Sequence, residues 1–182
     1  AEDVAVDADG AIYITGATSG GTVGGTPLSS IPTVSAFQSD PLGRLDAFVM
    51  KIDAKGEKLV YSTYLGGGGS TFDSGNEVGR AIAVDGTGRA YVIGYSSSED
   101  YPLVHPLQLG TQAGPWDAFV TRLDTSGCAI GYSTLFGGGN TDDAFGLAVN
   151  AAENVYVVGD TASGDFPLVS PFQAAHRGGA AR

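Results

Sequence analysis

The feature that most constrains the fold is an internal repeat. One pattern of thirteen residues recurs three times in the 182-residue chain, at residues 4–16, 82–94 and 147–159. Each copy has a short apolar run, a turn rich in Asp, Gly or Asn, and a second apolar run that ends in Gly. Recurrence of this kind predicts a fold built from stacked supersecondary units, because no single unit can bury its apolar face alone.

A second pattern occurs twice, in residues 46–68 and 117–139, at a constant offset of 71 residues. Both copies begin Asp-Ala-Phe-Val, pass through a basic residue and an Asp, and continue to Tyr-Ser-Thr and a run of glycines. A linking motif, an aromatic-Pro-Leu followed by an apolar residue and Gln, stands in residues 101–108 and 166–173. Residues 31–38 carry a variant of it after a Gly-rich insertion, which indicates that insertions fall in loops.

Each unit is predicted to form four short strands joined by tight turns. In the second unit the predicted strands are residues 81–84, 90–94, 118–123 and 129–136. Apolar and mixed residues alternate with period two along residues 48–52, which is typical of a strand with one face more buried than the other. No segment shows a sustained helical period.

The expected fold class is therefore all-β, with four-stranded antiparallel β-meanders stacked as the blades of a partial β-propeller. A β-sandwich is the alternative, although sandwiches do not normally repeat whole four-stranded units. Three copies of the first pattern and two of the second give about two and a half blades. We expect one propeller fragment over residues 1–182, with approximate repeats at 1–78, 79–143 and 144–182, the last of them incomplete.

Taken together, these motifs resemble the bacterial SBBP repeats, a family named for a seven-bladed β-propeller. The resemblance extends over essentially the whole chain. It implies a propeller of these units within a large secreted or cell-surface bacterial protein. It implies no common catalytic residues.

Composition and charge narrow the classes of partner. The net charge of −11 disfavours nucleic acid and anionic membrane surfaces as partners, because both are negatively charged. No apolar run approaches the roughly 20 residues of a membrane helix, so we expect no membrane insertion. The chain opens inside a strand-like pattern, as expected after removal of a leader or for an internal segment. We expect a secreted or cell-surface location.

The partners expected first are further blades. So few blades cannot close a ring, and unpaired strand edges favour the addition of strands from a neighbour. Further repeats of a longer parent chain, or other copies of this chain, are therefore the expected partners. Assembly of copies head to tail into a filament or a ring is compatible with the sequence. A glycan or a cell-surface protein is a further possible partner.

Calcium is the one cofactor that the sequence suggests, and two acidic groups are its candidate ligands. Asp7 and Asp9 resemble the start of a calcium loop, but Thr18 stands where such a loop needs a bidentate Glu. The alternative is a hairpin turn capped by the Asp7 side chain. The second group follows the glycine runs and consists of Asp142 and Asp143 in one copy and Asp73 and Glu77 in the other. Its alternative is a solvated turn.

Two further positions have both a structural and a functional interpretation. Asp46 and Asp117 precede Ala-Phe-Val in both copies, and we expect their carboxylates to accept hydrogen bonds from main-chain N–H groups where the loop enters the strand. Trp116 is a candidate contact for a sugar ring or a protein partner. The alternative for Trp116 is packing between blades.

The sequence offers little for catalysis. There is no Gly-x-Ser-x-Gly elbow and no His-Glu-x-x-His motif, and the two histidines lie in a loop and in the tail. We therefore expect no enzyme but a non-catalytic structural or interaction module. A calcium-dependent carbohydrate-binding module is the alternative, and a glycan-active propeller enzyme with carboxylates on its loops is the third interpretation.

Overall fold

The computed structural model describes residues 1–19, 22–23, 26–27, 31–69, 75–108 and 113–175. All regular elements in these residues are β-strands, so the predicted all-β class is confirmed. The described part of the chain has no helix that is long and apolar enough to cross a membrane.

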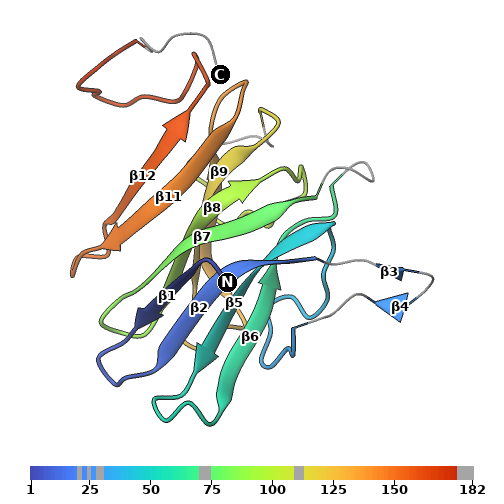
Figure 1. Cartoon of the computed structure of the whole chain (residues 1–182). Coiled ribbons are helices and arrows are strands. Elements are labelled where there is room, and N and C mark those ends of the chain that lie inside the picture. The colour runs from blue at the N-terminus through green and yellow to red at the C-terminus, as the bar shows by residue number, and fades with distance from the viewer. Residues whose placement is uncertain (20–21, 24–25, 28–30, 70–74, 109–112, 176–182) are drawn as a thin grey trace.

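Two four-stranded sheets and one hairpin make up the fold (Figure 1). The first sheet contains β1 (Asp3–Val6), β2 (Ile12–Ser19), β5 (Leu45–Ile52) and β6 (Leu59–Leu65). The second contains β7 (Glu77–Val84), β8 (Ala90–Ser96), β9 (Asp117–Leu123) and β10 (Ile130–Phe136). The hairpin is formed by β11 (Asp142–Val149) and β12 (Val155–Thr161). All pairs are antiparallel between neighbours in each unit, which confirms the predicted meander.

A small extra hairpin lies within the Gly-rich insertion of the first unit. It pairs β3 (Thr22–Val23) with β4 (Thr26–Pro27) and is separate from the first sheet. The insertion therefore leaves the four-stranded order of the first sheet unchanged, as expected for a loop.

The first strand of each later unit is longer than its apolar run. The residue 78/79 border of the predicted repeats falls inside β7, and the 143/144 border falls inside β11. β7 has a β-bulge between Gly79 and Ala81, and β11 has an equivalent bulge between Ala144 and Gly146. Each strand therefore begins before the bulge, several residues ahead of its apolar run.

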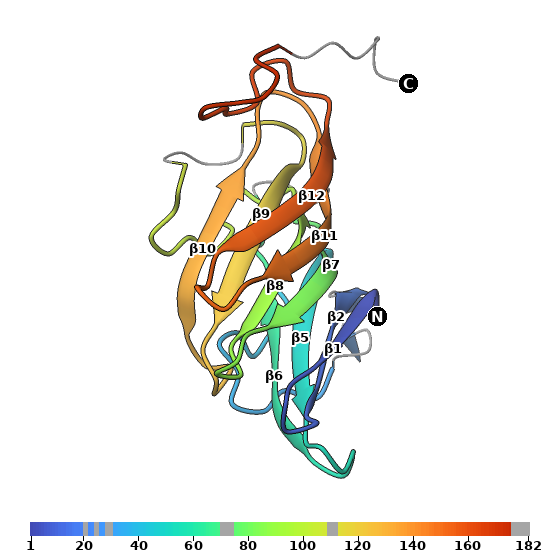
Figure 2. The ribbon, with the colours of Figure 1, turned by 90° about the vertical axis from the view of Figure 1, so that its left-hand side faces the viewer.

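The sheets stack face to face, and the core lies between them. One apolar cluster joins Tyr13, Val49 and Tyr61 of the first sheet to Phe119 and Leu123 of the second. A second cluster joins the second sheet to the hairpin, and Figure 2 shows β11 and β12 lying over β8 and β9. Each sheet thus buries one face against the next unit along the chain.

The face of β5 that carries Val49 packs on the second sheet. Val49 on this face is buried, whereas the other face is buried at Phe48 and half-buried at Met50 and Ile52. Burial along β5 therefore does not alternate as the period-two pattern of Phe48, Met50 and Ile52 predicts: the strand is buried on both faces from Asp46 to Val49 and half-buried from Met50 to Ile52.

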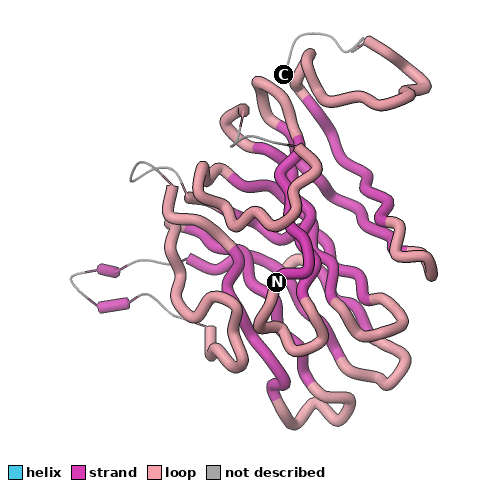
Figure 3. Tube along the Cα trace, turned by 180° about the vertical axis from the view of Figure 1, so that it is seen from behind, coloured by secondary structure: helices cyan, strands magenta, loops and turns pink. Residues whose placement is uncertain are grey.

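The linking motif has the same backbone form in all three units. Val34 forms an antiparallel bridge with Ser62, and Val104 forms the equivalent bridge with Ser133. The residues after the motif's valines are Ser35, His105 and Ser170, and all three adopt the left-handed region, with φ of 46°, 49° and 48°. Turns and loops gather at the two ends of the strands (Figure 3).

Candidate functional site

The junctions between units contain buried polar groups in repeated positions. At the first junction, the carboxyl groups of Asp46 and Glu77 both lie against Gly66. A Cβ atom at Gly66 would lie 2.7 Å from Asp46 Oδ1 and 2.6 Å from Glu77 Oε2. Because such distances are below van der Waals contact, only glycine allows the two carboxyl groups to approach the chain this closely.

Glu77 lies at the start of β7 and is fully buried. Ser96 and Ser98 donate hydroxyl hydrogen bonds to its Oε1 at 2.7 and 2.6 Å, and the N–H of Gly67 donates to its Oε2 at 3.1 Å. Burial raises the pKa of Glu77 to about 7, although these hydrogen bonds lower it. The charge of Asp46 raises this pKa further. This carboxyl group therefore titrates near neutral pH.

The second junction repeats the arrangement, with Asp117 and Asp142 both lying against Gly137. Asp142 Oδ2 accepts hydrogen bonds from the N–H of Gly138 and the hydroxyl of Ser163, both at 2.8 Å. Oδ1 of Asp117 and Oδ1 of Asp142 are buried, and neither atom has a hydrogen-bond partner among the residues that the structure describes. Burial raises the pKa of Asp117, and the charge of Asp142 contributes in the same direction, while the N–H of Ala113 opposes the rise.

Main-chain N–H groups surround the first carboxylate of each pair. Asp46 Oδ1 accepts from the N–H of Leu42 at 3.1 Å, and Oδ2 accepts from that of Gly43 at 3.2 Å. Asp117 Oδ2 accepts from the N–H of Ala113 at 2.7 Å. These contacts confirm the prediction that both carboxylates bind the backbone where the loop enters the strand.

A third repeated carboxylate binds the glycine runs themselves. Asp100 accepts hydrogen bonds from the N–H groups of Gly68 and Gly69, and Asp165 accepts one from that of Gly139. Sequence reasoning missed this role, although both residues stand directly before an aromatic-Pro-Leu motif. Their constant place in the repeat was the signal that could have identified them.

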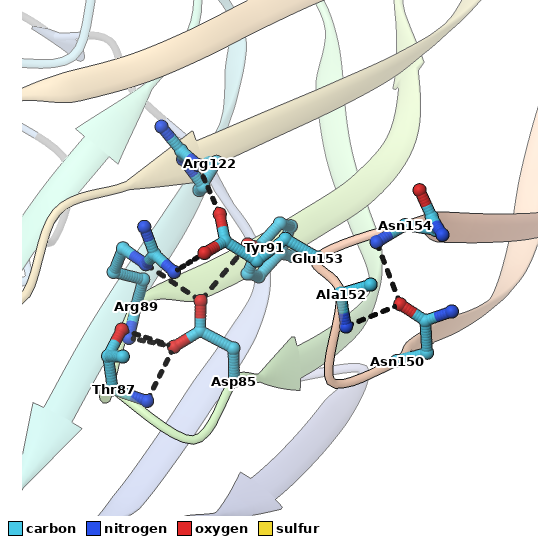
Figure 4. A network of polar contacts seen from close by, with 9 residues as sticks. All are labelled: Asp85, Thr87, Arg89, Tyr91, Arg122, Asn150, Ala152, Glu153 and Asn154. Atoms are coloured by element: carbon cyan, nitrogen blue, oxygen red, sulfur yellow. Dashed lines mark hydrogen bonds and ion pairs between the residues drawn. The ribbon is translucent and has the colours of Figure 1, made fainter.

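At the opposite end of the strands, a charged network joins the second sheet to the hairpin (Figure 4). Asp85 accepts from the N–H groups of Thr87 and Arg89 at 2.9 and 3.1 Å, and from the Arg89 Nε at 2.7 Å. Arg89 also pairs with Glu153 at 2.6 Å, and Arg122 pairs with the same Glu153 at 3.2 Å. Glu153 has a φ of 63°, in the turn position held by glycines in the first two units.

The candidate calcium ligands in the first hairpin form a capped turn. Asp7 Oδ1 accepts from the N–H groups of Asp9 and Ala11 at 3.1 and 2.9 Å, and Oδ2 accepts from the Tyr13 hydroxyl at 2.9 Å. Lys51 Nζ lies 3.6 Å from Asp7 Oδ2. Although burial opposes the change, the hydrogen bonds of Ala11 and Tyr13 lower the pKa of Asp7. Asp9 is exposed. This geometry matches the alternative interpretation of this turn.

The other calcium candidates are divided between separate contacts. Asp143 pairs with Arg80 at 3.3 Å, whereas Asp142 and Glu77 lie in different junctions. Asp73 lies outside the described residues. Among the residues that the structure describes, no three His, Cys, Asp or Glu side chains gather as metal ligands. Calcium binding therefore stays a prediction.

Trp116 is half-exposed and packs within the second unit. Its ring stacks on Tyr95 with the ring centroids 5.0 Å apart. Its carbonyl accepts a hydrogen bond from the N–H of Asp142 at 2.9 Å. The ring therefore packs on Tyr95 of its own unit, the main chain of Trp116 contacts the next unit, and the side chain remains 43% exposed to a partner.

An apolar groove of about 590 Å³, named here the open groove, lies between β10 and the hairpin. Its principal lining residues are Leu107, Val120, Tyr132, Phe136, Val155 and Val157. Leu107 is 87% exposed. No motif in the sequence marks this groove as a site, although the unequal numbers of the two repeated patterns indicate an unfilled position beside the last unit.

The stacked meander sheets with repeated junctions define an all-β partial β-propeller. Residues 60–102 match the model of the SBBP family, whose description is a beta-propeller repeat. The match runs from β6 through β7 and β8 to the second linking motif, and so confirms the resemblance across the first junction. The comparison with curated proteins gives no match.

Proposed function

We propose that the chain is a non-catalytic structural or interaction module of a secreted or cell-surface bacterial protein, and that it acts by contact through its open blade faces. The β-propeller repeat supports a structural or interaction role. The rigid stacked sheets provide the scaffold, and the partners are further blades of a parent chain or of other copies.

One observation carries the proposal: equivalent side chains are buried at a junction and exposed at the outer face of the first sheet. Ile82 of β7 is 5% exposed because it packs against the first sheet. Val4 occupies the same place in β1 and is 58% exposed, and Val6 beside it is 59% exposed. The outer face of the first sheet thus exposes apolar side chains whose counterparts in the second unit pack against a neighbouring blade.

The contacts of the buried carboxyl groups support a structural role. Glu77 and Asp142 bind serine hydroxyls and glycine N–H groups that hold consecutive units together. The acidic net charge supports a location outside the cell in contact with proteins rather than with nucleic acid. Antibody labelling of intact cells of the native bacterium tests this location, and labelling only after lysis would contradict it.

The test of the interaction role is the mass of the purified chain in solution as a function of concentration. We expect the average mass to rise with concentration above that of one chain. The Val4→Asp/Val6→Asp double variant should associate more weakly, because it places carboxylates in the apolar contact. Lys55→Asp is the matched control, since it lowers the net charge by the same amount at an exposed turn residue.

A chain that stays monomeric at every concentration would contradict the proposal. So would an association that the double variant and the Lys55→Asp control weaken equally, because the effect would then be one of net charge alone.

A further inference from the structure

The hairpin β11–β12 corresponds to the first two strands of a blade, and no third strand pairs with its outer edge in the described part of the chain. β2 pairs with β5, and β8 pairs with β9, whereas β12 pairs only with β11 within the described residues. Unpaired edges favour strand addition. In the first two units, the strand beside the edge equivalent to that of β12 is β5 or β9.

The first junction also shows what fills the equivalent of the open groove. Tyr61 and Leu65 correspond to Tyr132 and Phe136 of the groove and are fully buried in one apolar cluster that includes Phe119 and Leu123 of β9 and Leu135 of β10. The turn of that hairpin lies directly on the Tyr61 ring, since a Cβ at Gly127 would lie 2.3 Å from it. Tyr132 and Phe136 are only half-buried. The open groove thus has the shape left when such a hairpin is absent.

The register of the first two units fixes how the incoming strand would pair. Gly16 lies opposite Phe48, and Gly94 lies opposite Phe119. Gly159 is the equivalent glycine of β12, so an incoming Asp-Ala-Phe-Val strand would place its Phe opposite Gly159. A glycine beside an aromatic residue leaves room for the ring to lie across the neighbouring strand.

The third linking motif is in place for the fourth strand. Val34 and Val104 each exchange two main-chain hydrogen bonds with the Ser of a Tyr-Ser-Thr strand, at 2.8 to 3.1 Å. Val169 is the equivalent residue and is 93% exposed. Ser170 after it already has the left-handed φ of its two counterparts. The backbone that would bind a Tyr-Ser-Thr strand is therefore formed before the strand is present.

We propose that the open groove and the free edge of β12 form a docking site for one β-hairpin of the pattern Asp-Ala-Phe-Val to Tyr-Ser-Thr, supplied by a further repeat. This inference rests on the proposed function and names the partner for one open face. A second copy of the chain is not the occupant, because its own two hairpins of this pattern are already paired in its first and second sheets.

The experiment adds the missing hairpin to the intact chain. The sequence of residues 117–140 is fused directly after Arg182, which places the new Asp ten residues after Gln173; the corresponding separations are eight and nine residues in the first two units. We expect the fused chain to unfold at a higher temperature, and the amides of β12 and of Val169 to exchange hydrogen more slowly. The protein should remain a monomer at the low concentration used.

Two controls separate docking from an unspecific effect of added residues. In the first, the appended copies of Phe119 and Leu123 are changed to Asp, which removes the side chains that fill the groove. In the second, Leu107→Asp is introduced with and without the fusion. It should leave the unfolding temperature of the unfused chain unchanged, because Leu107 is exposed. In the fused chain it should reduce the protection of the β12 amides from hydrogen exchange.

Unchanged exchange at β12 in the fused chain would overturn the inference, as would equal gains from the intact and the Asp-substituted hairpin. Protection of β12 in the unfused chain that grows with concentration would also overturn it, because a second copy would then be the occupant. If β12 stays unprotected while association still depends on Val4 and Val6, this inference fails and the proposed function stands.

Discussion

At the scale of single residues, the junctions depend on glycines that lie against carboxyl groups. Asp46 and Glu77 both lie against Gly66, and Asp117 and Asp142 both lie against Gly137. The glycine runs therefore have a packing role at the junction, in addition to any freedom of the backbone. Their N–H groups serve as the donors that compensate the buried carboxylates.

The Gly66→Ala variant should lose about 1–3 kcal/mol of unfolding free energy, because the new methyl group overlaps both carboxyl groups and forces the strands to shift. Gly86→Ala is the matched control. It lies in a turn with open space around it and no left-handed φ, and should change stability by less than about 0.5 kcal/mol. Denaturant unfolding of both variants measures the difference, and equal losses would argue against the close packing at Gly66.

Glu77 should make stability depend on pH. Its pKa of about 7 in the folded state lies above its ordinary value of 4.5, so the folded state binds the proton more tightly than the unfolded chain does. The contribution of Glu77 to unfolding free energy is therefore full below about pH 4.5 and declines as the pH rises through about 7.

The Glu77→Gln variant should show a smaller fall in stability between about pH 5 and about pH 8, by up to about 3 kcal/mol. Burial also raises the pKa of Asp46, so this carboxyl group contributes a pH dependence of the same sign in both proteins. Urea unfolding at the two pH values tests this, with Glu57→Gln at an exposed site as the control. If wild type and Glu77→Gln show the same pH dependence, Glu77 is not the titrating group.

At the scale of elements, the turns of the two long hairpins show how contact with a neighbouring blade changes the surroundings of an equivalent glycine. The β5–β6 turn has Gly56 with a φ of 73°, and the β9–β10 turn has Gly127 with a φ of 75°. A Cβ at Gly56 would meet nothing within 4 Å, whereas one at Gly127 would meet the Tyr61 ring. The two turns differ in their contact with the preceding sheet.

Gly56→Ala should cost about 1–2 kcal/mol, the strain of a left-handed alanine. Gly127→Ala should cost at least about 1 kcal/mol more, because the same strain is joined by overlap with a buried aromatic ring. Thermal unfolding of the two variants compares them directly. Similar losses would mean that the second hairpin does not pack on Tyr61.

At the scale of the whole molecule, the repeated patterns predicted the all-β class, the meander and the stacking of units. They did so because each pattern combines a strand period with a fixed turn, as in the Asp and Gly of residues 53–56 and 124–127. The longer extent of β7 and β11 was not predictable from apolar residues, because the added part begins with Glu77 or Asp142 and passes through a bulge.

The carboxyl pairs could not be predicted from the sequence for a related reason. Glu77 and Asp142 occupy the same place in the repeat with different side chains, so the pattern did not show them as equivalent. They also resembled calcium ligands, since an acidic residue after a glycine run is compatible with both roles. Only the packing of β7 and β11 against the preceding unit places these carboxyl groups beside Gly66 and Gly137.

The attachment of the incomplete third unit has a consequence for how such a protein is synthesised. The hairpin β11–β12 packs on the second sheet, through its own apolar cluster and the Glu153 ion pairs, with only two strands of its blade in place. During synthesis, each new unit can therefore pack on the preceding unit as soon as its first two strands have emerged. Growth of the array would then proceed in steps of two strands, and each step would leave an apolar groove and exposed side chains such as Tyr156 and Val158 for the next two strands to cover.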